Sequence, residues 1–296
     1  MTPPKLKIAV GIASAGRQAI LRKTVAQLSL QSRPPDALIV CPLASDGVDA
    51  ATFAGFPAKT RVITGPVGTS AQRNSILTAA DDADIIVFFD DDFLAAPDYL
   101  ATLENTFATY PDVTGVTGHL LADGIHGPGL SVSQGLELLH SVQPRPLADF
   151  EPRPGTYGCN MAFRMAPIRA NRLRFDENLP LYGWQEDIDF SLRQAPFGRT
   201  LKCNRMIGVH LGVKSGRTSG VRFGYSQIAN PIYLTHKGTM SWRHAMMLMW
   251  RNIVSNLVRS FYPEPWIDRK GRLKGNLIAL TDVATRRLSP SRILQL

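Results

Sequence analysis

Residues 85–93 read IIVFFDDDF, an apolar run that ends on three adjacent aspartates before a phenylalanine. A near-continuous apolar run of this kind is typical of a strand covered on both faces in a parallel sheet. We therefore predict a strand over residues 84–89, with Asp90, Asp91 and Asp92 just past its carboxyl end. Ligands of open α/β sheets bind at the carboxyl ends of strands, so the three carboxylates lie where a binding site is expected.

The rest of the first half alternates between two hydrophobic periodicities. Apolar runs predict strands, and apolar residues at helical spacing predict helices between them. The predicted strands are 7–13, 36–41 and 59–64, and the predicted helices are 19–31, 70–80 and 97–111. This alternation predicts an α/β fold with a doubly wound, mostly parallel sheet flanked by helices. Residues 122–158 are rich in Gly and Pro, and we expect them to form a loop.

The composition is that of a folded globular protein, because 44% of the 296 residues are hydrophobic and 19% are charged. No apolar stretch approaches the roughly 20 residues that span a bilayer, so we predict no transmembrane segment. The three cysteines, Cys41, Cys159 and Cys203, are far apart and lack the spacing of a zinc site. This usage favours the reducing environment of the cytoplasm.

Positive charge is concentrated near the C-terminus. The net charge is +9, and the segment from Lys237 onward holds 11 basic and 3 acidic residues, whereas residues 1–236 are almost neutral. We therefore predict a main domain over residues 1–236 and a basic, amphipathic helical region over residues 237–296.

The aspartate triplet has two interpretations. Residues two apart in an extended segment point the same way, so Asp90 and Asp92 can face one cation while Asp91 faces elsewhere. Carboxylates are hard ligands that suit Mg²⁺ or Mn²⁺, and such ions commonly bridge a protein to a diphosphate. Aspartates are also common in turns, and an acidic turn before the next helix explains the triplet equally well.

The stretch LYGWQEDIDFSLRQA, residues 181–195, predicts a helix that begins near Glu186. The helix dipole favours acidic residues in the first turn, and this effect alone accounts for Glu186 and Asp187. The functional interpretation is a general base at the mouth of a site, with Trp184 stacking on a ligand.

Six short motifs, taken together, decide between these interpretations. They are IAVGIASAGR, QSRPPDALIV, GTSAQRNSILTAA, VFFDDDF, GCNMAFR and GWQEDIDFSLR, in this order along the chain. In order and spacing the chain resembles the family-two glycosyltransferases from about residue 6 to residue 238. The resemblance implies a GT-A fold, a nucleotide-sugar donor, a divalent metal ion (Mn²⁺ or Mg²⁺) and inversion at the anomeric carbon.

The resemblance also implies roles for the acidic residues. The DDD stretch matches the Asp-X-Asp motif of the family, which makes Asp92 a metal ligand and places Asp90 on the ribose or the metal shell. His210, at the end of the strand-like MIGVH, is a third candidate ligand, although a histidine at a strand end can simply be hydrogen bonded. Asp187 matches the catalytic base, and Glu186 is the second candidate. Trp184 is assigned to the acceptor side.

Other matching positions form the expected donor site. They are Ala13, Ser14, Arg73, Asn74, Asp90, Asp91, Gly158 and Asn160. Ala13 and Ser14 are offered only as backbone contacts, because ASAGR lacks the aromatic residue that is usual after the serine. Arg73 has a second interpretation as a surface charge on its helix. After the second strand the chain reads VCPLASDGVD, where the first acidic residue is Asp46, so the usual acidic contact to the donor base is missing.

We therefore predict an inverting, metal-dependent glycosyltransferase. Its acceptor would be a glycan or lipid-linked saccharide in cell-surface or exopolysaccharide synthesis. One alternative is a sugar nucleotidyltransferase of related fold, which needs a phosphate loop richer in glycine and basic residues after the first strand. Another is a non-catalytic, membrane-associated scaffold with a decayed site. The basic tail contains no recognised nucleic-acid-binding module, so we predict no nucleic-acid partner.

Residues 241–262, SWRHAMMLMWRNIVSNLVRSFY, project onto an amphipathic helix. Its apolar face holds Met246, Met249, Trp250, Ile253, Val254, Leu257 and Phe261, and its polar face holds Arg251, Asn252, Ser255, Asn256 and Arg259. Such a helix can pack on the catalytic domain. Because many cations follow it, we predict instead that it binds an anionic membrane surface. This places the protein in the cytoplasm, peripheral on the inner face of the cell membrane.

Overall fold

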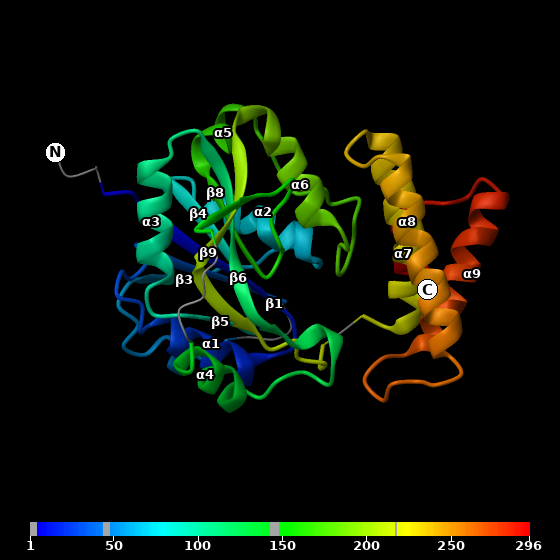
Figure 1. Ribbon diagram of the computed structural model, residues 1–296, viewed down its shortest axis with the longest axis horizontal. Coiled ribbons are helices and arrows are strands. Elements are labelled where there is room, and N and C mark those ends of the chain that lie inside the picture. The colour runs from blue at the N-terminus through cyan, green and yellow to red at the C-terminus, as the bar shows by residue number, and fades with distance from the viewer. Residues whose placement is uncertain (1–4, 44–47, 143–147, 217) are drawn as a thin grey trace. The chain divides into compact units, whose positions relative to one another are not determined.

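The computed structural model describes residues 5–43, 48–142, 148–216 and 218–296, and Figure 1 shows its elements. The chain forms two compact units. The first consists of Met1–Pro66, Gln72–Arg174 and Phe190–Gly216, and the second of Val67–Ala71, Phe175–Asp189 and Arg217–Leu296. The domain boundary predicted between residues 236 and 237 stays a prediction.

A nine-stranded sheet forms the centre of the first unit (Figure 1). Its order is β3-β2-β1-β4-β8-β6-β9-β5, and β7 pairs with β9. The strands are β1 Ile8–Ser14, β2 Ala37–Pro42, β3 Lys59–Val62, β4 Ile85–Asp90, β5 Phe93–Ala95, β6 Val113–Asp123, β7 Phe150–Pro152, β8 Asn160–Arg164 and β9 Arg199–His210. Strands β1 to β4 are parallel, as are β6 and β9, whereas β5, β7 and β8 pair antiparallel. The predicted α/β class is confirmed.

Strand β4 forms because its apolar residues are buried on both faces of the sheet. It lies between β1 and β8, and the five residues from Ile85 to Phe89 are at most 2% exposed. Burying a side chain of this size stabilises the fold by about 1.5–3 kcal/mol. Asp90 is the last residue of the strand and pairs in register with Ala13 of β1. The apolar run thus ends at the edge of the sheet, as the sequence predicts.

The helices of the first half confirm the predicted alternation, with ends shifted by up to three residues. They are α1 Gln18–Leu28, α2 Thr69–Ala79 and α3 Tyr99–Thr109, and α4 Val132–His140, α5 Met165–Ala170 and α6 Glu186–Gln194 follow along the chain. Helix α1 shows why the pattern was readable, because its apolar residues Leu21, Val25 and Leu28 are the ones it buries.

Residues 122–158 do not form the continuous loop that we predicted. The described part of this segment contains the end of β6, a 3₁₀ helix at Gly124–His126, helix α4 and strand β7. Helix α4 begins with a capping box, in which Ser131 Oγ accepts from Gln134 N and Gln134 Oε1 accepts from Ser131 N. This Ser-x-x-Gln signal is present in the sequence, and the surrounding Gly and Pro residues obscured it.

The described part of the second unit continues with helices, which confirms the predicted helical C-terminal region. They are α7 Gly220–Lys237, α8 Trp242–Arg259 and α9 Arg269–Ala284. Helices α7 and α9 touch through glycines. A Cβ added to Gly224 would lie 2.0 Å from Arg272 O, and one added to Gly275 would lie 2.1 Å from Val221 O. Only glycine permits this approach of the two backbones.

The helix predicted over residues 241–262 is confirmed as α8, but one of its predicted faces is wrong. Asn256, assigned to the polar solvent face, is fully buried, and its Nδ2 donates to Gln227 Oε1 and Asn276 Oδ1. Of the apolar face, Met249 is buried, whereas Met246, Trp250, Leu257 and Phe261 are 57%, 67%, 46% and 75% exposed. Helix α8 therefore packs partly through amides and leaves much of its apolar face exposed. No helix in the described ranges is long and apolar enough to cross a membrane.

Candidate metal and donor site

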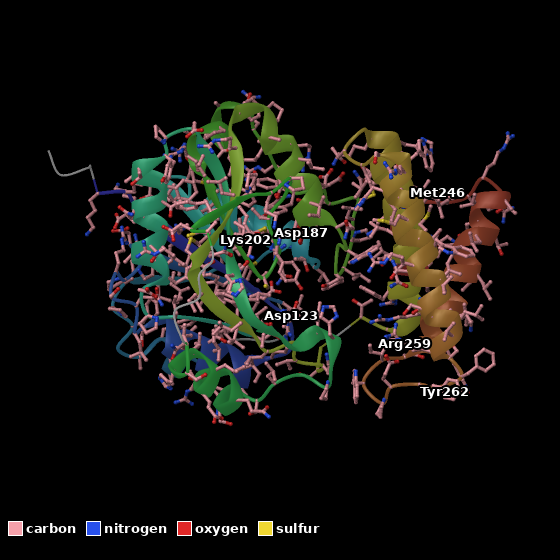
Figure 2. The ribbon with its side chains drawn as sticks, in the orientation of Figure 1. Asp123, Asp187, Lys202, Met246, Arg259 and Tyr262 are labelled. Atoms are coloured by element: carbon pink, nitrogen blue, oxygen red, sulfur yellow. The ribbon has the colours of Figure 1, made fainter. Side chains whose placement is uncertain are left out.

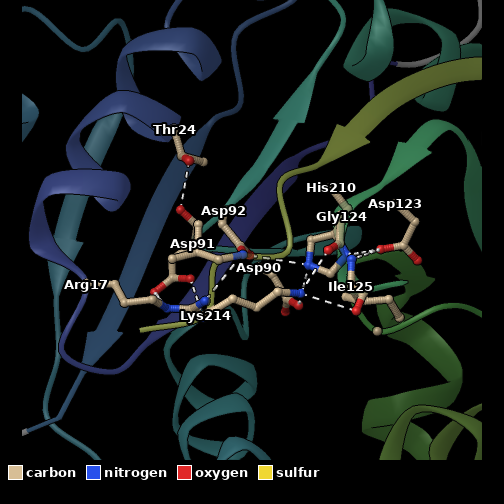
Figure 3. A network of polar contacts seen from close by, with 12 residues as sticks. Arg17, Thr24, Asp90, Asp91, Asp92, Asp123, Gly124, Ile125, His210 and Lys214 are labelled. Carbon is tan, nitrogen blue, oxygen red and sulfur yellow. Dashed lines mark hydrogen bonds and ion pairs between the residues drawn. The ribbon is translucent and has the colours of Figure 1, made fainter. Parts of the chain in front are cut away.

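Three side chains converge at one edge of the sheet. Asp90 ends β4, Asp92 lies in the turn between β4 and β5, and His210 ends β9. One potential ligand atom of each lies within 4.8 Å of the others, and Figure 3 shows the three side chains together. The antiparallel pairing of Phe93 with His210 brings this turn to the end of β9. The structure thus brings together the predicted metal ligands.

His210 links this group to a fourth carboxylate. Its Nδ1 lies 2.9 Å from Asp123 Oδ1, and its Nε2 lies 3.4 Å from Asp92 Oδ1 and 3.9 Å from Asp90 Oδ2. Burial acts to lower the pKa of His210, but the contacts with Asp123, Asp92 and Asp90 outweigh it and raise that pKa to about 10. The surrounding carboxylates therefore favour a positive charge at this point.

Asp92 is buried, with 1% of its surface exposed. Its Oδ2 accepts a hydrogen bond from Val213 N at 2.8 Å and lies 3.3 Å from Arg17 Nη1. Its Oδ1 is also buried and accepts no hydrogen bond from any described residue. Burial acts to raise the pKa of Asp92, but His210 and Arg17 lower it to about 2, so the carboxylate is ionised at neutral pH.

The donor set of Asp90, Asp92 and His210 fits a divalent cation. Carboxylate oxygens are hard ligands, and imidazole is accepted by several divalent metals, including Mn²⁺ in mixed sites. The buried Asp92 Oδ1 without a hydrogen-bond donor is the kind of atom that a cation satisfies. These three residues would hold the ion, and a bound divalent ion supplies Lewis-acid stabilisation of a phosphate leaving group.

Asp91 points to a different set of partners. Ser14 Oγ donates to its Oδ2 at 2.6 Å, Arg17 Nη2 lies 2.6 Å from its Oδ1, and Thr24 Oγ1 donates to its carbonyl oxygen at 2.7 Å. Figure 3 shows the contacts with Arg17 and Thr24. Burial raises the pKa of Asp91 to about 7 despite the opposing charge of Arg17. Asp91 thus ties the acidic turn to the end of β1 and to α1, and its assignment to the donor site stays a prediction.

Arg73 is not a surface charge, which was one of its two interpretations. The residue is 3% exposed, its Nη2 lies 3.1 Å from Asp90 Oδ1, and the same nitrogen donates to Gly158 O at 2.8 Å. Asn74 is buried next to it on α2. The structure therefore brings Arg73 and Gly158 to the Asp90 side of the metal group.

The remaining donor-site candidates lie on neighbouring strand ends. Ala13 pairs in register with Asp90, and the carbonyl oxygen of Ser14 accepts a hydrogen bond from Gln72 Nε2 at 3.0 Å. Asn160 is fully buried, and its Oδ1 accepts from Thr117 Oγ1 at 2.6 Å. Asp46 lies outside the described residues. Donor contacts of these residues stay predictions.

Trp184, Glu186 and Asp187 belong to the second unit, at the start of α6. Glu186 is 6% exposed, and Asp187 is partly exposed and accepts a hydrogen bond from Ile188 N through its Oδ1. Both carboxylates are in the first turn, where the helix dipole stabilises negative charge. Asp189 lies deeper and pairs with Lys237 Nζ at 2.8 Å, as a structural carboxylate does.

The turn before α6 has an unusual backbone. Leu181 and Gln185 have φ values of 58° and 76°, a left-handed conformation that costs non-glycine residues of order 1–3 kcal/mol. The turn is held in place because Asn230 Nδ2 donates to Trp184 O at 2.9 Å and the Trp184 ring packs on Phe223. Such strain is typical of segments that present functional side chains.

Sequence analysis missed three residues of the metal group's surroundings. Arg17 contacts Asp91 and Asp92, and its position in ASAGR after the first strand was the available signal. Asp123 contacts His210, and Tyr157 OH donates to Asp123 Oδ2 at 2.7 Å. Asp123 reaches His210 through the pairing of β6 with β9, which no local pattern reveals.

Comparisons with known proteins bear on the family resemblance and the fold. Residues 3–143 match the sequence profile of the family described as "Glycosyltransferase like family 2". The structure of residues 1–349 of S. aureus TarS is similar at a TM-score of 0.58 and 13% identity, over 97% of this chain and 82% of that chain. The mannosyltransferase PcManGT from Pyrobaculum calidifontis, in complex with GDP-Man and Mn²⁺, has a TM-score of 0.57 and 13% identity, over 98% and 86% of the two chains.

TarS 1–349 in complex with UDP is also similar, at a TM-score of 0.51 and 14% identity. That match covers 77% of this chain and 65% of the TarS chain, slightly less than two thirds of its length. No curated protein matches the sequence. The structural likenesses confirm the predicted fold, and the profile match confirms the resemblance that the motifs indicated.

Proposed function

We propose that the chain is an inverting, metal-dependent glycosyltransferase, and its resemblance to the family-two glycosyltransferases over residues 3–143 supports this. The donor is a nucleotide sugar, and the acceptor is a glycan or a lipid-linked saccharide of cell-surface or exopolysaccharide synthesis. The observation that carries the proposal is the convergence of Asp90, Asp92 and His210 at the carboxyl ends of the strands. A diphosphate is the donor group that such a cation site recognises.

The donor's charge is matched by residues already at the site. A divalent ion held by Asp90, Asp92 and His210 would neutralise the diphosphate that leaves as the glycosidic bond of the donor breaks. Arg73, which pairs with Asp90, adds a buried positive charge on the same side. Both the Mn²⁺ in the PcManGT complex and the UDP in a TarS complex support this choice of ligands.

Asp187 is the proposed general base, and it takes the proton of the acceptor hydroxyl as that oxygen attacks the anomeric carbon. Glu186 is the second candidate, but it is more buried than Asp187. Trp184 contributes an aromatic surface for the acceptor on the strained turn before α6. The resemblance to the family supports each assignment.

The two alternative functions have weaker support. A sugar nucleotidyltransferase needs a glycine-rich phosphate loop after the first strand, where ASAGR supplies one glycine. A scaffold with a decayed site needs no buried, ionised Asp92 beside an imidazole, because such groups cost stability unless they have a role.

A donor screen tests the proposal. Nucleotide sugars with different bases and sugars are added to the protein with Mn²⁺ or with a chelator, and the melting temperature is measured. A true donor raises it by mass action, by an amount equivalent to about 2.7 kcal/mol at 100 times the dissociation constant. We expect a shift that requires Mn²⁺ and is absent in Asp92→Asn. A panel in which no nucleotide sugar shifts the wild-type protein contradicts the proposal.

We also propose that the enzyme binds the cytoplasmic face of an anionic membrane through the exposed face of α8. This surface consists of Met246, Met247, Trp250, Val254, Leu257, Val258, Phe261 and Tyr262, which are 36–82% exposed. Figure 2 labels Met246 on α8 and Tyr262 on the turn after it. Helix α8 has no acidic residue, and Arg243, Arg251 and Lys270 are exposed cations in or near it. Each cation near an anionic leaflet adds about 1 kcal/mol to the attraction.

Point variants test this surface better than truncation, because Met249 of α8 and Ala279 of α9 form one core with α7 residues such as Tyr225. The double variant Trp250→Ser with Phe261→Ser should weaken co-sedimentation with anionic liposomes by roughly tenfold or more. The control Leu30→Ser changes an equally exposed apolar residue of the first unit. Binding should weaken as salt rises. Equal sedimentation of the double variant and the control contradicts the membrane assignment.

A further inference from the structure

We propose that Asp123 and Tyr157 are positioning residues that set the tautomer and the orientation of His210 for a metal ion. The inference rests on the proposed metal site and adds residues that no family motif assigned. Tyr157 OH donates to Asp123 Oδ2 at 2.7 Å, and Asp123 Oδ1 lies 2.9 Å from His210 Nδ1. Figure 3 shows the contact between Asp123 and His210.

The chain of contacts selects one nitrogen of the imidazole. A neutral imidazole carries its proton on one nitrogen only, and a carboxylate at Nδ1 keeps the proton there. In the neutral ring, the form that can bind a metal ion, the lone pair is then on Nε2, the nitrogen that faces Asp92 and Asp90 at 3.4 Å and 3.9 Å. Histidines that bind metals generally donate their other N–H to a carboxylate or carbonyl, which fixes the ring and raises its basicity.

The backbone around Asp123 is fixed to the strand of His210. Asp123 and His210 are partners in the parallel β6–β9 register. Next to them, Gly124 lies so close to β9 that an added Cβ would be 2.0 Å from Leu211 O. Lys214 Nζ donates to the carbonyl oxygens of Gly124 and Ile125 at 2.9 Å and 3.2 Å. The position of the Asp123 carboxylate is therefore set by the sheet itself.

Asp123 also has a local structural contact, since its Oδ1 accepts from Ile125 N at 3.2 Å. A purely structural role would need only this hydrogen bond, which caps the 3₁₀ helix at Gly124–His126. The Tyr157 hydroxyl on the second oxygen is not needed for the cap, and it holds the carboxylate plane toward the imidazole. The side chains of Asp123 and His210 are 18% and 9% exposed, so water competes little for these contacts.

The test compares Mn²⁺ binding by the full chain, without donor, for the wild type, Asp123→Ala, Asp123→Asn and Tyr157→Phe. Free Mn²⁺ is measured by electron paramagnetic resonance. Asp123→Ala should weaken binding by roughly 10- to 100-fold, the usual loss for such a partner. Asp123→Asn keeps an oxygen acceptor and should lose less, and Tyr157→Phe should lose least. The matched control is Asp112→Asn, which removes an exposed carboxylate paired with Arg199.

A spectroscopic readout separates positioning from folding. Pulsed resonance of bound Mn²⁺ should show nitrogen coupling in the wild type and in Asp112→Asn, none in His210→Ala, and reduced coupling in Asp123→Ala. Unchanged affinity and coupling in Asp123→Ala and Asp123→Asn, with wild-type binding intact, would overturn the positioning role alone. Failure of the wild type to bind Mn²⁺ would overturn the proposed metal site together with this inference. If Asp123→Ala does not fold, Asp123→Asn and Tyr157→Phe decide the question.

Discussion

The two units differ in the polar groups that they gather. The first unit gathers buried and partly exposed charged side chains at its sheet edge, namely Asp90, Asp91, Asp92, Asp123, Arg17, Arg73 and His210. Between α7, α8 and α9 the second unit buries a network of neutral amides, and it also buries charged residues such as Asp189 and Asp282. There Gln227 Nε2 donates to Asn252 Oδ1 at 2.8 Å, and Asn276 Nδ2 donates to Gly224 O at 2.7 Å. Asn256 bridges Gln227 and Asn276.

The difference indicates what each region is for. In the second unit, each of these amide groups is hydrogen bonded to another amide or to a carbonyl oxygen. The network therefore holds the helices in register at little electrostatic cost. The first unit gathers four carboxylates around three basic groups, and among the described residues none donates a hydrogen bond to Asp92 Oδ1. Local rules of stability are broken mainly at functional sites. The charged edge is therefore the place where a cation and an anionic ligand are expected.

The largest expected effect concerns Asp187, the proposed general base in the second unit. Asp187→Asn keeps the size of the side chain and removes the basic charge, so transfer should fall by roughly 10² to 10⁴ while donor binding persists. Both quantities are measured on the same preparation. Glu186→Gln is the comparison, and if it loses transfer while Asp187→Asn retains it, the base has been assigned to the wrong residue.

The next effect separates the two regions by their response to metal. Saturating Mn²⁺ should stabilise the wild type by about 2.7 kcal/mol at 100 times its dissociation constant. Asn256→Ala should show the same gain, because its network contains none of the proposed metal ligands, whereas Asp92→Asn should show none. Asp92 is buried, so the isosteric amide is the appropriate variant. If Mn²⁺ stabilised Asp92→Asn as much as the wild type, the proposed difference between the two units in their response to metal would be contradicted.

Removing an amide should cost stability without touching the donor site. Asn256→Ala leaves Gln227 and Asn276 with buried, unmet hydrogen-bonding groups and should lower the free energy of unfolding by about 1–3 kcal/mol. Denaturant unfolding measures the loss. Asn252→Ala, which removes one bond of the same network, serves as the milder control. A neutral result for Asn256→Ala would show that the network does not hold these helices.

The smallest effect comes from a charge near the surface of the second unit. Hydrogen bonds from Arg269 and Arg259 lower the pKa of Glu264 to about 2, below its ordinary value of 4.5. A depressed carboxyl pKa stabilises the fold above pH 4.5, and this contribution is lost as pH falls toward 2. Glu264→Gln should therefore be less stable than the wild type at pH 7, by under about 1 kcal/mol, and equal to it near pH 2. Glu137→Gln on α4 is the exposed control, and a difference that persists at pH 2 would assign the effect to packing.

Sequence patterns predicted the parts of the molecule that depend on local order. The apolar run before Asp90 fixed the position of β4, and the spacing of apolar residues located α1 and α8. The metal group was predicted because family motifs carry Asp92 and His210, although they are far apart in the chain. Sheet pairing then brings them together.

The unpredicted parts depend on tertiary contacts. Asp123 meets His210 through the β6–β9 register, and Tyr157 joins them from a segment expected to be a loop. We predicted Asn256 on the polar face because helix periodicity sorts residues only by their polarity. The pattern does not reveal that a polar side chain has a buried hydrogen-bond partner, as Asn256 has in Asn276. Secondary-structure propensity and hydrophobic pattern describe one segment of the chain at a time, whereas these contacts join segments that are distant in the sequence.

The most direct test of the account is the metal dependence of sugar transfer from a donor found in the screen. The account predicts that release of the nucleoside diphosphate stops in excess chelator and returns when Mn²⁺ is restored to the wild type, but does not return in Asp92→Asn. Undiminished release in excess chelator, or full recovery in Asp92→Asn, would contradict the claim that the charged edge of the sheet is a metal-dependent donor site.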